Sequence, residues 1–154
     1  MKYNFRKYED KDYNFIYELK KNAYKKYVEE FWGEWNDEKQ HLFFDNYIAQ
    51  QKDRIKIIVL DGKDIGYFDD KADENNYELV NIIVQPEYQG KGIGTQILKN
   101  AIEENRNKDI NIQCFLTNPV VELYKRLGFV ECEKTNTHIK LKMKALENDK
   151  TMNQ

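Results

Sequence analysis

Apolar residues recur at two different spacings along the chain, and the spacing changes where Gly, Pro, Asn or Asp gather. Short segments alternate apolar and polar positions, which is the period of a half-buried strand. Longer segments place apolar residues three and four positions apart, which is the period of an amphipathic helix. The order of these segments predicts a strand, two helices, three strands, a helix, a strand, a helix and two final strands.

The first half of the chain is predicted to contain one strand, two helices and a hairpin. Residues 3–8 alternate as a short strand, and helical spacing then begins at Asp12 and again at Asn36 or Asp37. Each of these three residues is a favoured helix N-cap. The sequence "DGKD" at residues 61–64 separates two β-rich runs, and Asp-Gly in that position is a strong hairpin signal.

The second half is predicted to hold one β-α-β unit. It consists of a strand at residues 77–84, a helix from Ile93 to Asn105 and a strand at residues 110–116. Such a unit crosses over right-handedly and places its two strands in parallel. A short helix then runs between Pro119 and Gly128, and two strands at residues 129–135 and 138–143 end the pattern.

Antiparallel hairpins combined with one β-α-β unit predict an α+β domain with a mixed, mostly antiparallel central sheet of about seven strands flanked by about four helices. We assign residues 1–144 to this domain. Residues 145–154 have no apolar period and are predicted to form a flexible C-terminal tail.

The composition argues against several classes of partner. The 25 basic and 27 acidic residues nearly balance, so neither nucleic acid nor an anionic membrane surface is indicated as a partner. The chain has no apolar run of the roughly 20 residues that span a bilayer, and its start lacks the apolar stretch of a signal peptide. These features predict a cytoplasmic protein.

The two cysteines, Cys114 and Cys132, fit neither a disulfide framework nor a zinc site. We expect both to be buried thiols, and we expect no metal.

Gly90, Gly92 and Gly94 stand together just before the third predicted helix. A helix start presents unpaired N–H groups and a partial positive charge. Because glycines have no side chains to block these groups, such a segment favours a phosphate or diphosphate ligand. A Walker loop does not fit, because Gln85 replaces its first glycine and Gly92 its Ser or Thr. A dinucleotide fingerprint does not fit either, because Thr95 replaces its third glycine.

The segment from Gln89 to Gly94 reads Q-x-x-G-x-G and resembles the diphosphate loop of the GCN5-related N-acetyltransferase (GNAT) superfamily. A second block, "NPVVELYKRLGF" at residues 118–129, is similar to that superfamily's N-x-x-A-x-x-x-Y-x-x-x-G-F segment, with Val121 in place of the alanine. The resemblance covers about residues 1–143. The stretch "AYKKYVEEFWGEWNDEKQ" also resembles a branch of uncharacterised bacterial acetyltransferases.

The resemblance implies acetyl-coenzyme A (acetyl-CoA) as co-substrate and a fold in which the fourth and fifth strands splay apart. Backbone N–H groups of the loop would hold the diphosphate, and Lys91 would add a charge near the phosphates. The pantetheine arm would pair with the fourth strand, and an N–H there would stabilise the oxyanion. The implied cofactor-binding residues are Ile82, Ile83, Val84, Gln89, Gly90, Lys91, Gly92, Ile93, Gly94, Thr95, Asn118 and Tyr124.

Two residues are candidates for proton transfer by the same resemblance. Tyr124 occupies the tyrosine position of the second block and is the candidate general acid for the departing thiolate, or else packs under the cofactor. Glu78 lies eleven positions before Gln89 and matches a carboxylate that some members use as base. Alternatively, Glu78 is a solvated charge at the edge of the strand, and a chain of water molecules acts as the base.

The acceptor is implied to be a primary amine, bound near the first two helices. There Phe31, Trp32 and Trp35 offer apolar or cation-π walls, or else the two tryptophans belong to the core. Nearby carboxylates would favour a cationic amine; they are Glu29, Glu30, Glu34, Asp37 and Glu38.

The resulting hypothesis is an acetyl-CoA-dependent N-acetyltransferase that moves the acetyl group directly to an amine of a small molecule or protein in a ternary complex. The alternative is a non-catalytic acyl-CoA-binding sensor or interaction module on the same fold. The sequence leaves the acceptor and the oligomeric state open, a homodimer included.

Overall fold

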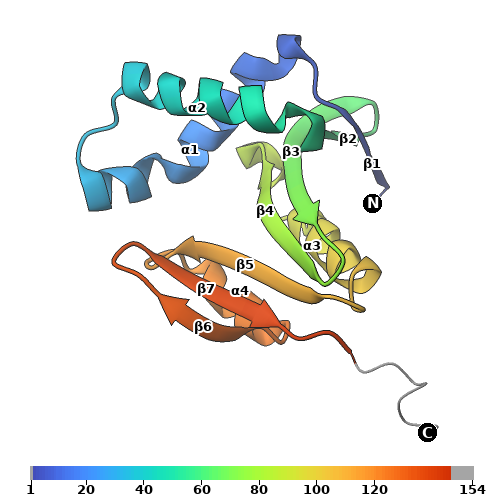
Figure 1. Cartoon of the computed structure of the whole chain (residues 1–154). Coiled ribbons are helices and arrows are strands. Elements are labelled where there is room, and N and C mark those ends of the chain that lie inside the picture. The colour runs from blue at the N-terminus through green and yellow to red at the C-terminus, as the bar shows by residue number, and fades with distance from the viewer. Residues whose placement is uncertain (1, 147–154) are drawn as a thin grey trace, which may run out of the picture. The chain divides into compact units, whose positions relative to one another are not determined.

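The computed structural model describes residues 2–146, and its elements follow the predicted order. In this part of the chain the strands are β1 (Tyr3–Lys7), β2 (Ile55–Leu60), β3 (Lys63–Ala72), β4 (Asn76–Val84), β5 (Asp109–Phe115), β6 (Val130–Lys134) and β7 (His138–Met143). The α-helices are α1 (Tyr13–Trp32), α2 (Asp37–Gln51), α3 (Ile93–Glu104) and α4 (Val120–Arg126), as Figure 1 shows.

All seven strands belong to one sheet, in the order β1-β2-β3-β4-β5-β7-β6. The neighbours β4 and β5 are parallel, whereas β1 with β2, β2 with β3, β5 with β7 and β6 with β7 are antiparallel. The predicted α+β class with a mixed, mostly antiparallel sheet is therefore confirmed. The parallel register joins Asn76–Leu79 to Asp109–Ile112, so it covers the first part of β4.

The chain divides into two compact units. The first unit comprises the residues up to Asp69 together with Asn81–Thr95, and the second comprises Asp70–Val80 together with the residues from Gln96 onward. The division runs through β3, β4 and α3, so each of these elements contributes residues to both units.

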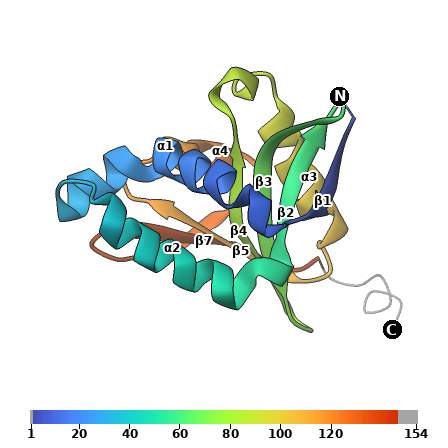
Figure 2. The same cartoon turned by 90° about the horizontal axis from the view of Figure 1, so that it is seen from above.

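In the first unit, α1 and α2 lie side by side (Figures 1 and 2) and pack onto β2, β3 and the end of β4. The apolar face of each helix, set by three- and four-residue spacing, supplies one layer of this core and alternate strand residues supply the other. The buried cluster consists of Tyr8, Ile16, Tyr17, Leu19, Trp35, Phe44, Ile48, Ile55, Ile57, Tyr67 and Ile83. The β2–β3 hairpin turns at Asp61 and Gly62, both with positive φ, as the Asp-Gly pair predicts.

The predicted helix starts differ in how they are capped. The Asn36 side chain accepts from the N–H of Lys39 at 2.9 Å, which confirms it as the cap of α2. Helix α1 begins after Asp12, as predicted, but the Asp12 carboxylate does not cap it. It accepts instead from Arg6, at 2.8 and 2.9 Å, and from the N–H of Glu9.

The Arg6–Asp12 pair is expected to make stability fall in acid. The Arg6 hydrogen bonds hold the pKa of Asp12 below its ordinary value. A depressed folded-state pKa means that the stabilisation is present above the unfolded pKa of about 3.9 and is lost as the pH falls through the folded pKa. Urea unfolding should therefore give a free-energy difference between wild type and Asp12→Asn that is largest near pH 6 and shrinks below pH ~4. A difference that is independent of pH would contradict this role of the pair.

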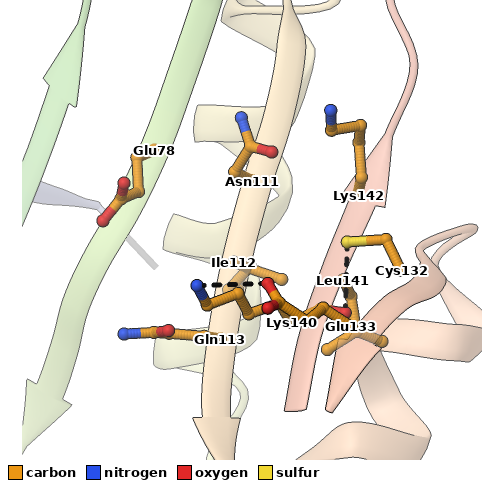
Figure 3. Close-up of a pocket in the computed structure, with 9 residues that line it drawn as sticks. All are labelled: Glu78, Asn111, Ile112, Gln113, Cys132, Glu133, Lys140, Leu141 and Lys142. Atoms are coloured by element: carbon orange, nitrogen blue, oxygen red, sulfur yellow. Dashed lines mark hydrogen bonds and ion pairs between the residues drawn. The ribbon is translucent and has the colours of Figure 1, made fainter. Parts of the chain in front are cut away.

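In the second unit, β5, β7 and β6 form the sheet next to the first part of β4, and α4 lies behind them in Figure 1. Residues of β5 and β7 alternate between buried and accessible positions. The buried positions are Ile110, Ile112, Cys114, Ile139, Leu141 and Met143. The opposite face carries polar side chains and is the face toward the viewer in Figure 3.

One cysteine prediction is wrong. Cys114 is buried on β5, as expected, but Cys132 is exposed. Cys132 lies on β6, which is an edge strand of the sheet and is exposed at all five positions. Its alternating sequence does not reveal that both faces of this strand are exposed.

Two residues of the predicted tail are described, and both are hydrogen-bonded. The N–H of Ala145 donates to the Asp109 carboxylate and that of Leu146 to the carbonyl of Arg106, each at 2.9 Å. The rest of the predicted tail, residues 147–154, lies outside the described residues. Among the helices that are described, none has both the length and the apolar character needed to cross a membrane.

Candidate active site

The glycine segment forms an exposed turn between β4 and α3. After a short 3-10 helix at Pro86–Tyr88, the chain passes Gly90 and Gly92 with φ of 76° and 84° and enters α3 at Ile93. Left-handed φ values favour glycine, because they are strained for residues with a Cβ. A Cβ built on either glycine would meet nothing within 4 Å, so the backbone here is open to a ligand. This is the geometry expected of an anion site at a helix start.

Gln89 anchors the turn to the strand that precedes it. Its side-chain Nε2 donates to the carbonyl of Val84 at 2.9 Å, and its own N–H donates to the carbonyl of Pro86 at 3.1 Å. The ammonium of Lys91 lies 5.8 Å from the centroid of the Tyr88 ring. The loop is therefore fixed to the end of β4 by the Gln89–Val84 hydrogen bond, and Lys91 gives it a positive charge.

The end of β4 is positioned by Gly66 of β3. A Cβ on Gly66 would lie 2.1 Å from the carbonyl oxygen of Ile83 and 2.9 Å from the Cα of Val84, so only glycine allows this approach. The side chains of Ile83 and Val84 are buried. These residues therefore offer a ligand only their backbone. Sequence reasoning missed Gly66; a lone glycine within a strand is the signal that could have found it.

In the second unit, Asn118 lies two residues before α4 and Tyr124 lies within it. The Asn118 side chain accepts from the N–H of Val120 at 3.0 Å, which stabilises the helix start. Tyr124 is half-buried, and its ring centroid lies 6.0 Å from that of Phe129. The helix ends at Arg126, and Gly128 follows two residues later with a φ of 109°, which lets the N–H of Phe129 donate to the carbonyl of Tyr124.

Glu78 lies on β4 in the second unit, and its side chain is 38% exposed. Its carboxylate is 3.7 Å from the ammonium of Lys71, and in the parallel register its partner is Asn111 of β5. The side chain lines a groove of about 440 Å³ on the polar face of the sheet (Figure 3). The other groove residues are Asn111, Ile112, Gln113, Cys132, Glu133, Lys140, Leu141 and Lys142.

The three aromatic residues suggested for the acceptor end differ in exposure. Trp32 is 61% exposed and Phe31 is half-buried, with their ring centroids 6.1 Å apart. Trp35 is only 9% exposed and belongs to the core of the first unit, where its Nε1 donates to Asp37. Of the three, Phe31 and Trp32 are therefore the ones accessible to an acceptor.

Asp37 and Glu29, among the nearby carboxylates, accept hydrogen bonds from other residues of the first unit. Asp37 accepts from Tyr17, Lys21 and Trp35, and these hydrogen bonds hold its pKa well below the usual range. Glu29 accepts from the N–H of Trp35 at 3.0 Å. The negative charge of Asp37 is therefore balanced by Lys21, and less charge remains to attract a cationic amine than the sequence suggests.

Each unit thus carries part of the predicted site. The first unit holds the loop from Gln89 to Thr95 together with Ile82–Val84, Phe31 and Trp32, and the second unit holds Glu78, Asn118 and Tyr124. Among the residues that the structure describes, no group of three or more His, Cys, Asp or Glu side chains is arranged to hold a metal ion.

The chain is similar to proteins named as N-acetyltransferases. An uncharacterized N-acetyltransferase of Gracilaria tenuistipitata is 34% identical over 56 residues, which are 36% of this chain and 31% of that protein. An uncharacterized N-acetyltransferase of Methanocaldococcus jannaschii is 26% identical over 121 residues, which are 70% of this chain and 49% of that protein. The chain therefore spans at most about half the length of these two curated relatives.

Solved structures share the fold. The crystal structure of PaiA N-acetyltransferase from Thermoplasma acidophilum in complex with coenzyme A superimposes with a TM-score of 0.67 over 94% of this chain and 99% of that one, at 19% identity. Residues 51–131, more than half of the 154 residues, match the acetyltransferase (GNAT) domain family. The matched segment includes β4, the glycine turn, α3 and α4. The chain therefore belongs to the GNAT acetyltransferase family.

Proposed function

We propose that this protein is an acetyl-CoA-dependent N-acetyltransferase that transfers the acetyl group directly to a primary amine in a ternary complex. The observation that carries the proposal is the exposed turn at Gly90 and Gly92, with left-handed backbone and open space at the start of α3. Acetyl-CoA would supply the activated acetyl thioester. Membership of the GNAT family supports this choice among ligands that carry a diphosphate.

On the donor side, backbone N–H groups from Gly90 to Thr95 would bind the diphosphate, and Lys91 would add charge. Because Gln89 is fixed to Val84, the turn and the end of β4 form one rigid support in the first unit. The backbone of Ile82–Val84 would hold the pantetheine arm, and an N–H there would donate to the oxygen that gains negative charge. Asn118 of the second unit is proposed to hydrogen-bond the same arm.

Two side chains would carry out the proton transfers. Glu78, directly or through water, would take the proton that the amine loses as its nitrogen forms the new C–N bond. As the C–S bond breaks, Tyr124 would give its hydroxyl proton to the departing thiolate and regain one from solvent. The accessible carboxylate of Glu78 and the half-buried position of Tyr124 support these roles.

Replacing Tyr124 with phenylalanine is expected to lower kcat about a hundredfold, because general acid catalysis contributes roughly that much or more. The dissociation constant for acetyl-CoA should stay unchanged. A matched control is Tyr77→Phe, since the Tyr77 hydroxyl donates to Asp70 and has no part in the proposed chemistry. Equal kcat for Tyr124→Phe and wild type would contradict the role as general acid.

The proposal as a whole is tested by incubating the full chain with acetyl-CoA and a panel of primary amines. The panel should include alkylamines, amino acids, polyamines, amino sugars and peptide N-termini. Mass spectrometry of the acetylated amine is the preferred readout, because the exposed Cys132 thiol would interfere with thiol reagents. Acetylation of any amine supports the enzyme. Tight binding of acetyl-CoA by calorimetry without acetylation of any amine would instead indicate a binding module.

A further inference from the structure

The groove beside Glu78 contains an ordered row of polar side chains across three strands. Glu78 of β4 pairs with Asn111 of β5, and Asn111 pairs with Lys142 of β7. Directly paired residues point to the same face of a sheet, so these three side chains share the groove (Figure 3). The row therefore runs from a carboxylate through an amide to an ammonium.

The two lysines of the groove differ in whether a nearby carboxylate neutralises their charge. Lys140 is paired with Glu133 of β6 at 3.3 Å, so its charge is neutralised locally. Lys142 is half-buried, and within residues 2–146 it makes no ion pair. An unbalanced, half-buried ammonium beside an amide side chain is suited to a carboxylate ligand. The amide is that of Asn111, the register partner of Lys142.

We propose that the acceptor is a small amine that also carries a carboxylate several bonds away from its nitrogen. This inference rests on the proposed function, in which Glu78 receives the proton of the amine. The ammonium end of the acceptor would lie at Glu78 and its carboxylate at Lys142, with Asn111 donating a hydrogen bond between them. A groove of about 440 Å³ is within the usual range for small-molecule sites.

The register also limits the length of the acceptor. Strands β4 and β7 are separated by β5, so their backbones lie roughly 10 Å apart, two strand spacings. An α-amino acid holds its two charged groups on one carbon and is too short to reach both ends of the row. An ω-amino acid with a chain of about four to six carbons matches the span, because the Glu78 and Lys142 side chains cover the remainder.

The test compares pairs of acceptors that differ only in the carboxylate, using the full chain with saturating acetyl-CoA. In wild type, kcat/KM for 5-aminopentanoate should exceed that for pentylamine at least about tenfold, as expected for a charge-assisted contact. Glycine should be a poor acceptor. In Lys142→Met the ratio should fall to near one. Lys134→Met, which removes a lysine paired with Glu131 outside the groove, should keep the wild-type ratio.

The outcomes separate this inference from the proposed function. Acetylation of pentylamine and 5-aminopentanoate with equal kcat/KM, or a ratio that Lys142→Met leaves unchanged, would overturn the inference alone. If no amine is acetylated, the proposed function fails, and binding of 5-aminopentanoate followed by saturation-transfer NMR decides the inference. Binding that Lys142→Met weakens about tenfold supports the groove as its site, and absence of binding rejects it.

Discussion

Replacing Gly92 with valine is expected to weaken acetyl-CoA binding at least about a hundredfold while the protein remains folded. Gly92 has φ of 84°, and nothing lies within 4 Å of the position of its missing Cβ. A side chain there would fill the open space over the turn and tilt the N–H groups at the start of α3. Loss of one or two charge-assisted hydrogen bonds, each contributing about 1.5–3 kcal/mol, corresponds to this change in affinity.

The strain of the substitution is measured separately by a matched variant, Gly62→Val. Gly62 also has positive φ, 78°, and open space at its Cβ, but it belongs to the β2–β3 turn. Both variants should lower the free energy of unfolding by about 1–2 kcal/mol, the cost of left-handed backbone for a residue with a Cβ. Calorimetry with acetyl-CoA should then show weakened binding for Gly92→Val alone. Equal affinities for the two variants would reject the turn as the diphosphate site.

The order of elements was predictable because local patterns determine it. The alternation in β5 and β7, the Asp-Gly turn at residues 61–62 and the cap at Asn36 each act over a few residues, and the structure retains all of them. The glycine turn was predictable for the same reason, since Gly90 and Gly92 are adjacent to the helix that they precede. Features that depend on only a few neighbouring residues can be predicted without any information on tertiary contacts.

The features that sequence reasoning missed depend on partners far apart in the chain. Cys132 was predicted to be a buried thiol because it fits neither a disulfide nor a zinc site, but its exposure follows from the edge position of β6. The row from Glu78 to Lys142 exists only through the pairing of β4, β5 and β7. Gly66 is required only because β4 passes close to it. In each case the constraint comes from strands that pair although they lie far apart in the chain. No short segment of the sequence encodes such a pairing.

Asp69 belongs to the same class of features. It lies on β3, three residues before the strand ends at Ala72, and it is fully buried. Its carboxylate accepts from Arg54, with Nε at 2.5 Å and a second guanidinium nitrogen at 3.0 Å, and from the Tyr47 hydroxyl. A buried carboxylate is tolerated because these partners compensate its lost hydration. The cluster ties α2 to the sheet of the first unit.

Asp69→Ala is expected to lower the free energy of unfolding by about 3–5 kcal/mol, because it leaves the mostly buried Arg54 guanidinium without its counter-charge. The matched control is Asp64→Ala on the same strand, since Asp64 also pairs with an arginine, Arg6 at 2.7 Å, but is 43% exposed. That variant should lose no more than about 1 kcal/mol. Urea unfolding of both variants measures the contrast, and equal losses would contradict it. The double variant Asp69→Leu/Arg54→Met should recover part of the loss, since removing both charges together leaves neither one buried without a partner.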